Sequence, residues 1–242
     1  MTDVMDLQSL WVYLAARPLS ALLLTLLAYQ AGLWLYQRSG RRTWCNPVLI
    51  AVLLLGGLLK LSDTDYRTYF EGAQFVHFLL GPATVALAVP IYRQWRAVRQ
   101  SIGAIAMALT CGSATAIASA LLVGWAAGAT PAVLASLAPK SVTTPIAMSL
   151  AEYGGGLVSL TAVLVIVTGI LGAMVGPPLL DMIRVRDPHA RGLALGAAAH
   201  GIGTARAVQE SAAAAAFAGL AIGLNGLATA LLLPWVYALF SY

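Results

Sequence analysis

The chain alternates long apolar stretches with short polar links, and this pattern covers almost its whole length. Each stretch approaches the roughly 20 apolar residues that a helix needs to cross the hydrocarbon core of a bilayer. The pattern therefore predicts an all-α polytopic membrane protein, with a single transmembrane domain over residues 1–242. The candidate segments are Leu19–Tyr36, Pro47–Leu61, Ala73–Ile91, Ser101–Ala127, Ala132–Leu150, Leu157–Leu180, Gly192–Val208 and Ala212–Phe240.

The composition agrees with a protein that is embedded in a lipid bilayer. Hydrophobic residues make up 60% of the 242 residues and charged residues only 10%, against about 45–50% and 25% in an ordinary soluble domain. The mean hydropathy is +0.83. The formal net charge of +5 is carried by small basic clusters between the apolar stretches. Such clusters orient membrane proteins, so the charge gives no support to nucleic acid as a partner.

Three polar links are rich in arginine, and the positive-inside rule places them in the cytoplasm. They hold Arg38, Arg41 and Arg42, then Arg93, Arg96 and Arg99, then Arg184, Arg186 and Arg191. The uncharged link Gly124–Thr130 then lies outside, and two apolar segments separate it from the third basic link. One of the two therefore cannot cross, and Ala132–Leu150 is the better candidate because prolines interrupt it. We expect about seven transmembrane helices plus one re-entrant or broken hairpin.

The interruption in this segment is the run PKSVTTPIAM (Pro139–Met148), in which a lysine and three hydroxyl residues lie between Pro139 and Pro145. An ammonium, hydroxyls and backbone N–H groups freed by a broken helix together form an anion site. The candidate ligands for a small carboxylate are Lys140, Ser141, Thr143 and Thr144. Alternatively, the hydroxyls satisfy the freed backbone groups while the lysine reaches the interface. We favour the binding site because ionisable residues inside membranes usually mark function.

A second polar cluster lies in the glycine-rich stretch Gly192–Glu210. A histidine there titrates near neutrality and could carry a coupling proton, and an arginine could hold a carboxylate by two hydrogen bonds. The candidate substrate-binding residues are His200, Gly201, Gly203, Thr204 and Arg206. Alternatively, the glycines form a helix-packing face and Arg206 pairs with Glu210 one helical turn away.

A third break is expected at Gly81 and Pro82, where Thr84 would stand beside unpaired carbonyl groups and could line the same cavity. The runs Gly81–Thr84 and Gly203–Arg206 are each followed by a segment rich in glycine and alanine. With the orientation above, the two units face opposite ways, which predicts an inverted repeat with broken helices. Pairing Pro82 with the proline at 139 would instead give parallel units.

Motifs of enzymes and metal sites are absent from the sequence. It has no nucleophile elbow, phosphate-binding loop, dinucleotide fingerprint or HExxH motif, and His77, His189 and His200 lack the spacing of a metal site. The two cysteines, Cys45 and Cys111, lie in or beside apolar stretches and do not support a cysteine-type metal site. We therefore expect neither catalysis nor a metal or other cofactor.

Four longer runs, matching in order over nearly the whole chain, resemble the LrgB/CidB family of bacterial inner-membrane proteins. They are FLLGPATVALAVPIY (Phe78–Tyr92), PKSVTTPIAM (Pro139–Met148), TGILGAMVGPPLL (Thr168–Leu180) and RGLALGAAAHGIGTARA (Arg191–Ala207). The alanine run around Glu210–Ala216 departs from the family pattern. The resemblance implies a multi-pass protein of the bacterial inner (plasma) membrane and a small LrgA/CidA-type membrane partner.

The resemblance leaves two functions open. Bacterial members of that family are described as antiholin-like modulators of murein hydrolase activity and autolysis. Related plastid proteins are described as glycolate/glycerate translocators, and some bacterial pairs are linked to pyruvate uptake. The polar residues inside the apolar segments favour a transporter or facilitator of small monocarboxylates of the pyruvate, glycolate or lactate class. The alternative is the antiholin-like regulator, and the sequence leaves open whether the chain forms a homo-oligomer.

Overall fold

Helices make up every regular element in the part of the chain that the structure describes. This computed structural model describes residues 18–40, 42, 45–79, 82, 85–86 and 88–240. Four of the described helices are long and apolar enough to cross a membrane, which confirms the predicted helical membrane class but not the predicted count of about seven spans. The chain divides into two compact units, Met1–Ala86 and Leu87–Tyr242.

The first unit contains α2 (Pro18–Arg38), α3 (Pro47–Leu61) and α4 (Tyr66–Phe78). The side chain of Asn46 caps α3 by accepting hydrogen bonds from the backbone N–H groups of Val48 and Leu49. A hydrogen bond of 2.7 Å joins the hydroxyls of Thr25 and Tyr69 and so links α2 to α4. Apolar side chains cover much of the outer surface of these helices, as lipid contact requires.

In the described residues, the predicted segment Ala73–Ile91 is not one helix. Helix α4 ends at Phe78, and the next helix whose bounds are described, α6 (Ala88–Arg93), begins at Ala88. Of the residues expected to break this segment, Pro82 is exposed. Gly81 and Thr84 lie outside the described residues.

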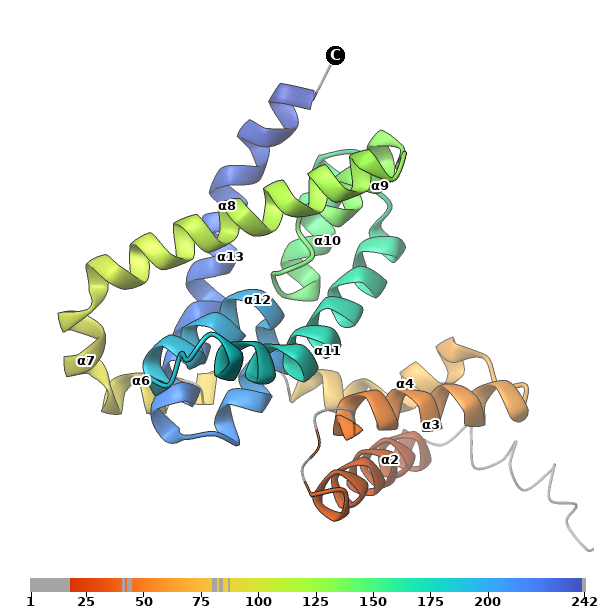
Figure 1. Ribbon diagram of the computed structural model, residues 1–242. Coiled ribbons are helices and arrows are strands. Elements are labelled where there is room, and N and C mark those ends of the chain that lie inside the picture. Colours follow the sequence, from red (N-terminus) through yellow and green to blue (C-terminus); the bar gives the residue numbers. More distant parts are fainter. Residues whose placement is uncertain are drawn as a thin grey trace, which may run out of the picture. The chain divides into compact units, whose positions relative to one another are not determined.

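The second unit contains the remaining helices (Figure 1). They are α6 (Ala88–Arg93), α7 (Trp95–Gln100), α8 (Ile102–Ala126), α9 (Pro131–Leu137), α10 (Thr144–Tyr153), α11 (Val158–Met182), α12 (Pro188–Val208) and α13 (Ala212–Phe240). Their apolar cores are small and numerous, and α13 contributes to three of them.

The pair α9 and α10 forms a hairpin at the place where the sequence predicts a break. Pro131 and Pro145 each stand in the first turn of their helix, where proline is tolerated. With 7 and 10 residues, the two helices are roughly 10 and 15 Å long. Neither can cross a hydrocarbon core of about 30 Å. Near the C-terminal end of α9, the Ser136 hydroxyl accepts a 2.7 Å hydrogen bond from the N–H of Leu157, the residue before α11.

Helix α12 is a second hairpin, whereas the sequence predicts a crossing segment over Gly192–Val208. The backbone leaves helical geometry at Ala199 and at His200, whose φ is +42°. The Arg191 Nε then lies 2.8 Å from a carboxylate oxygen of Glu210, 19 residues further on. A straight helix would separate these residues by roughly 28 Å. The chain therefore returns to the end at which α12 began.

A glycine makes this fold-back possible. A Cβ at Gly203 would lie 2.1 Å from the carbonyl oxygen of Leu195 on the outgoing arm of α12, so no side chain fits at that position. Periodicity does not reveal such a contact, because it forms only after the chain has turned back. Gly203 thus belongs to a packing face, which is one of the two alternatives that the sequence left open for the glycines.

The two hairpins have their open ends at opposite ends of α11 (Figure 1). The α9–α10 hairpin is joined by Ser136 to Leu157, beside the start of α11. The α12 hairpin is joined by Arg191 to Asp181, at the end of α11. A straight helix of the 25 residues of α11 would be roughly 37 Å long. Pro177 and Pro178 lie inside α11 and Figure 1 shows the helix bent, so the two open ends are closer together than this length.

We expect the contact between α12 and α13 to limit stability. A Cβ at Gly196 would lie 2.3 Å from the Ala218 carbonyl oxygen, whereas a Cβ at Gly223 meets nothing within 4 Å. Gly196→Ala should therefore lower the free energy of unfolding by about 1–3 kcal/mol through overpacking. Gly223→Ala is the matched control and should be neutral or stabilising by up to about 1 kcal/mol. Thermal unfolding of the purified variants in detergent measures both, and equal melting temperatures would contradict the close packing.

We also expect the two ends of α12 to face the same side of the membrane. In a background with Cys45 and Cys111 replaced by alanine, single cysteines at Arg186 and Gln209 should react only with a reagent delivered from the cytoplasm. Single cysteines at Ala127 and Glu152 should react only from outside. All four positions are exposed. Labelling of the first pair from opposite sides would show that α12 crosses the membrane and would refute the second hairpin.

Candidate functional site

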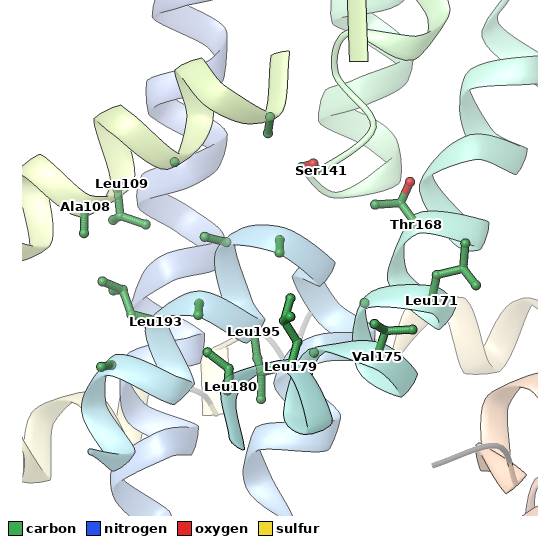
Figure 2. Close-up of a pocket in the computed structure, with 18 of the residues that line it drawn as sticks. Ala108, Leu109, Ser141, Thr168, Leu171, Val175, Leu179, Leu180, Leu193 and Leu195 are labelled. Carbon is green, nitrogen blue, oxygen red and sulfur yellow. The ribbon is translucent and has the colours of Figure 1, made fainter. Parts of the chain in front are cut away.

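A large cavity lies between α8, α11, α12 and the tip of the α9–α10 hairpin (Figure 2). Its volume is about 860 Å³. Small side chains form the α8 wall at Ala108, Gly112 and Ala116, which follow one another at a spacing of four residues and so share one helix face. On α11 the lining runs from Thr168 in the middle of the helix to Leu180 near its end, and the space is open on one side, where Leu171 and Val175 are exposed. We call this space the central cavity.

The polar groups of the central cavity come together where the hairpin tip meets α11. Among the described residues that line it are Lys140 and Ser141 from the tip and Thr168 from α11. The Lys140 ammonium donates to the Ser141 hydroxyl at 3.4 Å. Figure 2 shows the side chains of Ser141 and Thr168 on separate elements, the hairpin tip and α11, at the same end of the cavity. An ammonium and two hydroxyls can together bind one anionic group.

The tips of both hairpins are held by a single side chain, the amide of Asn225 on α13. Its nitrogen donates to the carbonyl oxygens of Ser141 at 3.2 Å and Ala197 at 3.0 Å. Its oxygen accepts a hydrogen bond of 2.5 Å from the Ser113 hydroxyl on α8. Asn225 is 2% exposed. Four elements therefore meet at this amide, close to the middle of both α8 and α13.

His200 stands at the turn of the α12 hairpin, and it faces α11 rather than the central cavity. Its Nε2 lies 2.9 Å from the Val165 carbonyl oxygen, and its side chain is buried. The ring packs onto Gly169, where a Cβ would lie 2.7 Å from the His200 Cε1. Thr204 is buried beside it and donates to the His200 carbonyl at 3.0 Å. A role for His200 in proton coupling stays a prediction.

Other residues expected to bind substrate lie outside the described lining of the central cavity. Thr143 occupies the position before α10, and Thr144 is the first residue of that helix. Gly201 faces open space, and Gly203 packs on the opposite arm of α12. Pro139, predicted to break a helix, is fully buried in the hairpin tip.

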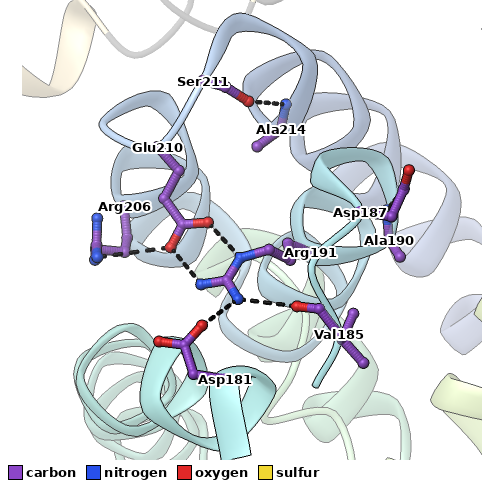
Figure 3. Close-up of polar contacts among 9 residues, drawn as sticks. All are labelled: Asp181, Val185, Asp187, Ala190, Arg191, Arg206, Glu210, Ser211 and Ala214. Carbon is purple, nitrogen blue, oxygen red and sulfur yellow. Dashed lines mark hydrogen bonds and ion pairs between the residues drawn. The ribbon is translucent and has the colours of Figure 1, made fainter. Parts of the chain in front are cut away.

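Arg206 belongs to a charged cluster where α11 ends and α12 begins and ends (Figure 3). It pairs with Glu210 at 3.5 Å, as the packing alternative proposed. The Arg191 guanidinium contacts both carboxylate oxygens of Glu210, a carboxylate oxygen of Asp181 at 2.6 Å and the Val185 carbonyl at 3.0 Å. This cluster ties the two arms of α12 to α11 and does not line the central cavity.

The start of α12 is fixed by a cap in the same region. The Asp187 carboxylate accepts a hydrogen bond of 2.9 Å from the backbone N–H of Ala190. This bond lowers the pKa of the Asp187 carboxyl group, because it stabilises the ionised form. The outgoing arm of α12 therefore starts at a definite residue next to the charged cluster.

Sequence reasoning assigned no role to Ser113, Thr168 or Asn225. Each is a polar residue near the middle of a long apolar segment. That position is the available signal, because a polar group at such depth needs a partner inside the protein. The sequence does not show which of these residues share a partner.

Comparison with curated proteins gives relatives that align along most of their own length. The chain is 36% identical over 217 residues to the uncharacterized protein YwbG of Bacillus subtilis (strain 168), covering 89% of this chain and 96% of the relative. It is 34% identical to the uncharacterized protein YxaC of the same strain, over 90% and 95% of the two chains. It is 31% identical to the antiholin-like protein LrgB of Bacillus mycoides (strain KBAB4), over 90% and 94%.

Two further comparisons concern the family and the fold. Comparison with the solved structures gives no match. The family model described as the LrgB-like family matches residues 25–239, a range that includes both hairpins, the central cavity and the charged cluster. The chain therefore belongs to the LrgB-like family.

Proposed function

We propose that this protein is a transporter or facilitator of small monocarboxylates of the pyruvate, glycolate or lactate class. The observation that carries this proposal is the position of Lys140 at the central cavity, with its ammonium beside the Ser141 hydroxyl, in a space that Thr168 also lines. In this proposal, the carboxylate of the substrate binds the ammonium and accepts hydrogen bonds from the two hydroxyls. A regulator without a solute would have no need for such a group at this depth.

Electrostatics supports a carboxylate as the ligand. A cation in apolar surroundings is costly unless an opposite charge or several dipoles accompany it. The described contact of the Lys140 ammonium is the Ser141 hydroxyl at 3.4 Å, which carries no charge. A bound carboxylate would supply the missing charge, and the start of α10 near the tip adds the partial positive charge of a helix N-terminus.

The arrangement of the hairpins supports transport through the membrane. The α9–α10 and α12 hairpins open at opposite ends of α11 and are joined at their tips by Asn225. Paired broken elements of opposite direction around a central site are a common plan of secondary transporters. We therefore propose that the chain contains an inverted repeat built on these two hairpins. We also propose that the chain has further membrane spans, up to the seven expected from the sequence.

The second candidate is an antiholin-like regulator of murein hydrolase activity and autolysis. It is favoured by the name of the antiholin-like protein LrgB of Bacillus mycoides (strain KBAB4), of which this chain covers 94%. Both candidates place the protein in the bacterial inner membrane and give it an LrgA/CidA-type partner. They differ in solute flux, because the regulator needs none.

Flux in liposomes is the experiment that separates these candidates. Purified protein, with and without its partner, should carry labelled pyruvate, glycolate or lactate into liposomes. Lys140→Met should lower substrate affinity by roughly 30-fold or more, because loss of a charged partner at a desolvated site costs about 2–5 kcal/mol. The chain has one other lysine, Lys60, which is exposed on α3. Lys60→Met is therefore the matched control and should transport like the unchanged protein.

Two results would contradict transport. One is the absence of flux of all three acids under every condition, including the presence of the partner. The other is equal affinity in Lys140→Met and in Lys60→Met, which would remove the anion site from the mechanism. Either result would favour the antiholin-like regulator.

Asn225→Leu should destabilise the second unit by about 1–3 kcal/mol, because it leaves the Ser141 and Ala197 carbonyl groups buried without this donor. Ser113→Ala removes only the third hydrogen bond of the amide and should cost less, about 0.6 kcal/mol. Ser119→Ala on the exposed face of α8 is the control and should have no measurable effect. Thermal unfolding in detergent tests this order, and a neutral Asn225→Leu would show that the tips do not depend on the amide.

A further inference from the structure

The hydroxyl of Thr168 has no hydrogen-bond partner among the described residues, although it stands near the middle of an apolar helix. A threonine hydroxyl inside a helix commonly bonds the carbonyl four residues earlier. Thr161 on the same helix and Thr204 on α12 do so, at 3.1 and 3.0 Å. Figure 2 shows the Thr168 oxygen directed away from the apolar side chains of Leu171 and Val175. The hydroxyl is therefore available to a ligand in the central cavity.

The polar side chains in the described lining of the cavity carry more donors than acceptors. They are Lys140, Ser141 and Thr168. The ammonium offers three N–H groups and no acceptor, and each hydroxyl offers one hydrogen and one oxygen. The Ser141 oxygen already accepts a hydrogen bond of 3.4 Å from the Lys140 ammonium. The Thr168 oxygen is thus the one side-chain acceptor of this described lining that has no donor.

A carboxylate uses the donors of this site but not its free acceptor. In the proposed function, it binds the ammonium and accepts hydrogen bonds from both hydroxyls. It brings no hydrogen of its own, so the lone pairs of the Thr168 oxygen stay without a donor. The other described lining residues are alanine, glycine, leucine and valine, whose side chains have no polar hydrogen. A ligand gains a further bond here only if it carries a donor close to its carboxylate.

A 2-hydroxy acid carries such a donor, whereas a 2-oxo acid and an unsubstituted acid do not. The hydroxyl of glycolate or lactate is on the carbon next to the carboxylate, within reach of a residue that binds that carboxylate. The keto oxygen of pyruvate can only accept, and C2 of acetate or propanoate carries only C–H groups. Both kinds of acid leave the Thr168 oxygen without a donor.

We propose that Thr168 is the residue by which the central cavity distinguishes 2-hydroxy acids from 2-oxo and unsubstituted acids. This inference rests on the proposed function and gives one of its hydroxyls a second task. The Thr168 O–H donates to the carboxylate, and the Thr168 oxygen accepts from the hydroxyl on C2. One additional hydrogen bond between neutral groups should favour the 2-hydroxy acid by roughly 3- to 10-fold.

Displacement of labelled glycolate from the purified full-length protein in detergent tests the inference. The competitors are glycolate and acetate, which have two carbons, and lactate, pyruvate and propanoate, which have three. The equal chain lengths within each set keep the apolar contacts matched. Glycolate should bind roughly 3- to 10-fold more tightly than acetate. The better-bound enantiomer of lactate should exceed pyruvate and propanoate by a similar factor.

Four variants separate the role of Thr168 from general weakening of the site. Thr168→Val removes the hydroxyl but nearly keeps the side-chain shape, so the ratio of glycolate affinity to acetate affinity should fall to about one, whereas Thr168→Ser should keep the ratio. Ser141→Ala should weaken both acids and leave the ratio unchanged. Thr115→Val removes a hydroxyl of α8 outside the described lining and should alter neither affinity. Where labelled glycolate binds a variant too weakly, calorimetric titration with each acid gives the ratio.

The outcomes distinguish this inference from the proposed function. If glycolate and acetate bind equally, and both depend on Lys140, the inference is overturned and the proposed function stands. If glycolate is preferred but the preference persists in Thr168→Val, the assignment to Thr168 is overturned. If no acid binds in a manner that depends on Lys140, both proposals fail.

Discussion

The hydrogen bonds of Asn225 are the interaction on which the middle of the second unit depends. A broken helix inside a bilayer leaves backbone carbonyl groups that water cannot reach, and these must find donors within the protein. Asn225 gives one amide hydrogen to Ser141 at one tip and the other to Ala197 at the second tip. One side chain thus makes two helix breaks tolerable at the same depth and fixes their distance from each other.

The two helix breaks held by Asn225 explain how a lysine can lie level with the middle of the long helices. A continuous helix at the position of the α9–α10 tip would present apolar side chains to its neighbours and leave no space between α8 and α11. Because the hairpin turns at Ala138–Thr143, Lys140 and Ser141 end at the cavity instead. The same break opens the space and brings the polar groups to it. A change that removed the break would therefore remove both the space and its polar lining.

The sequence predicted the first break but not the second, and the reason is physical. Pro139 and Pro145 exclude a continuous helix by local sterics, which can be read from the chain alone. The turn at His200 contains no proline, and it depends on contacts such as Arg191 with Glu210 that exist only in the folded unit. The same contacts explain why Arg206, expected at the substrate site, lies with the charged cluster.

The candidate site, like the two helix breaks, could be predicted from the sequence only in part. The position of Lys140 and Ser141 between two prolines was sufficient to identify them as candidate ligands. Thr168 was not identified, because one threonine in the long apolar segment of α11 looks the same whether it faces a cavity, a neighbouring helix or lipid. Identifying it required the direction of the side chain, which depends on how α11 packs against the hairpin tip.

The size of the residues in contact determines which parts of the second unit can move. At Gly196 the backbone of α12 lies so close to the Ala218 carbonyl that neither helix can slide along the other. The contact of α8 with α13 is made by larger side chains, including Ile105 and Phe217, which can exchange rotamers as the helices shift. The α12–α13 pair is therefore a fixed frame, and any motion that opens the cavity must involve α8, α11 or the α9–α10 hairpin.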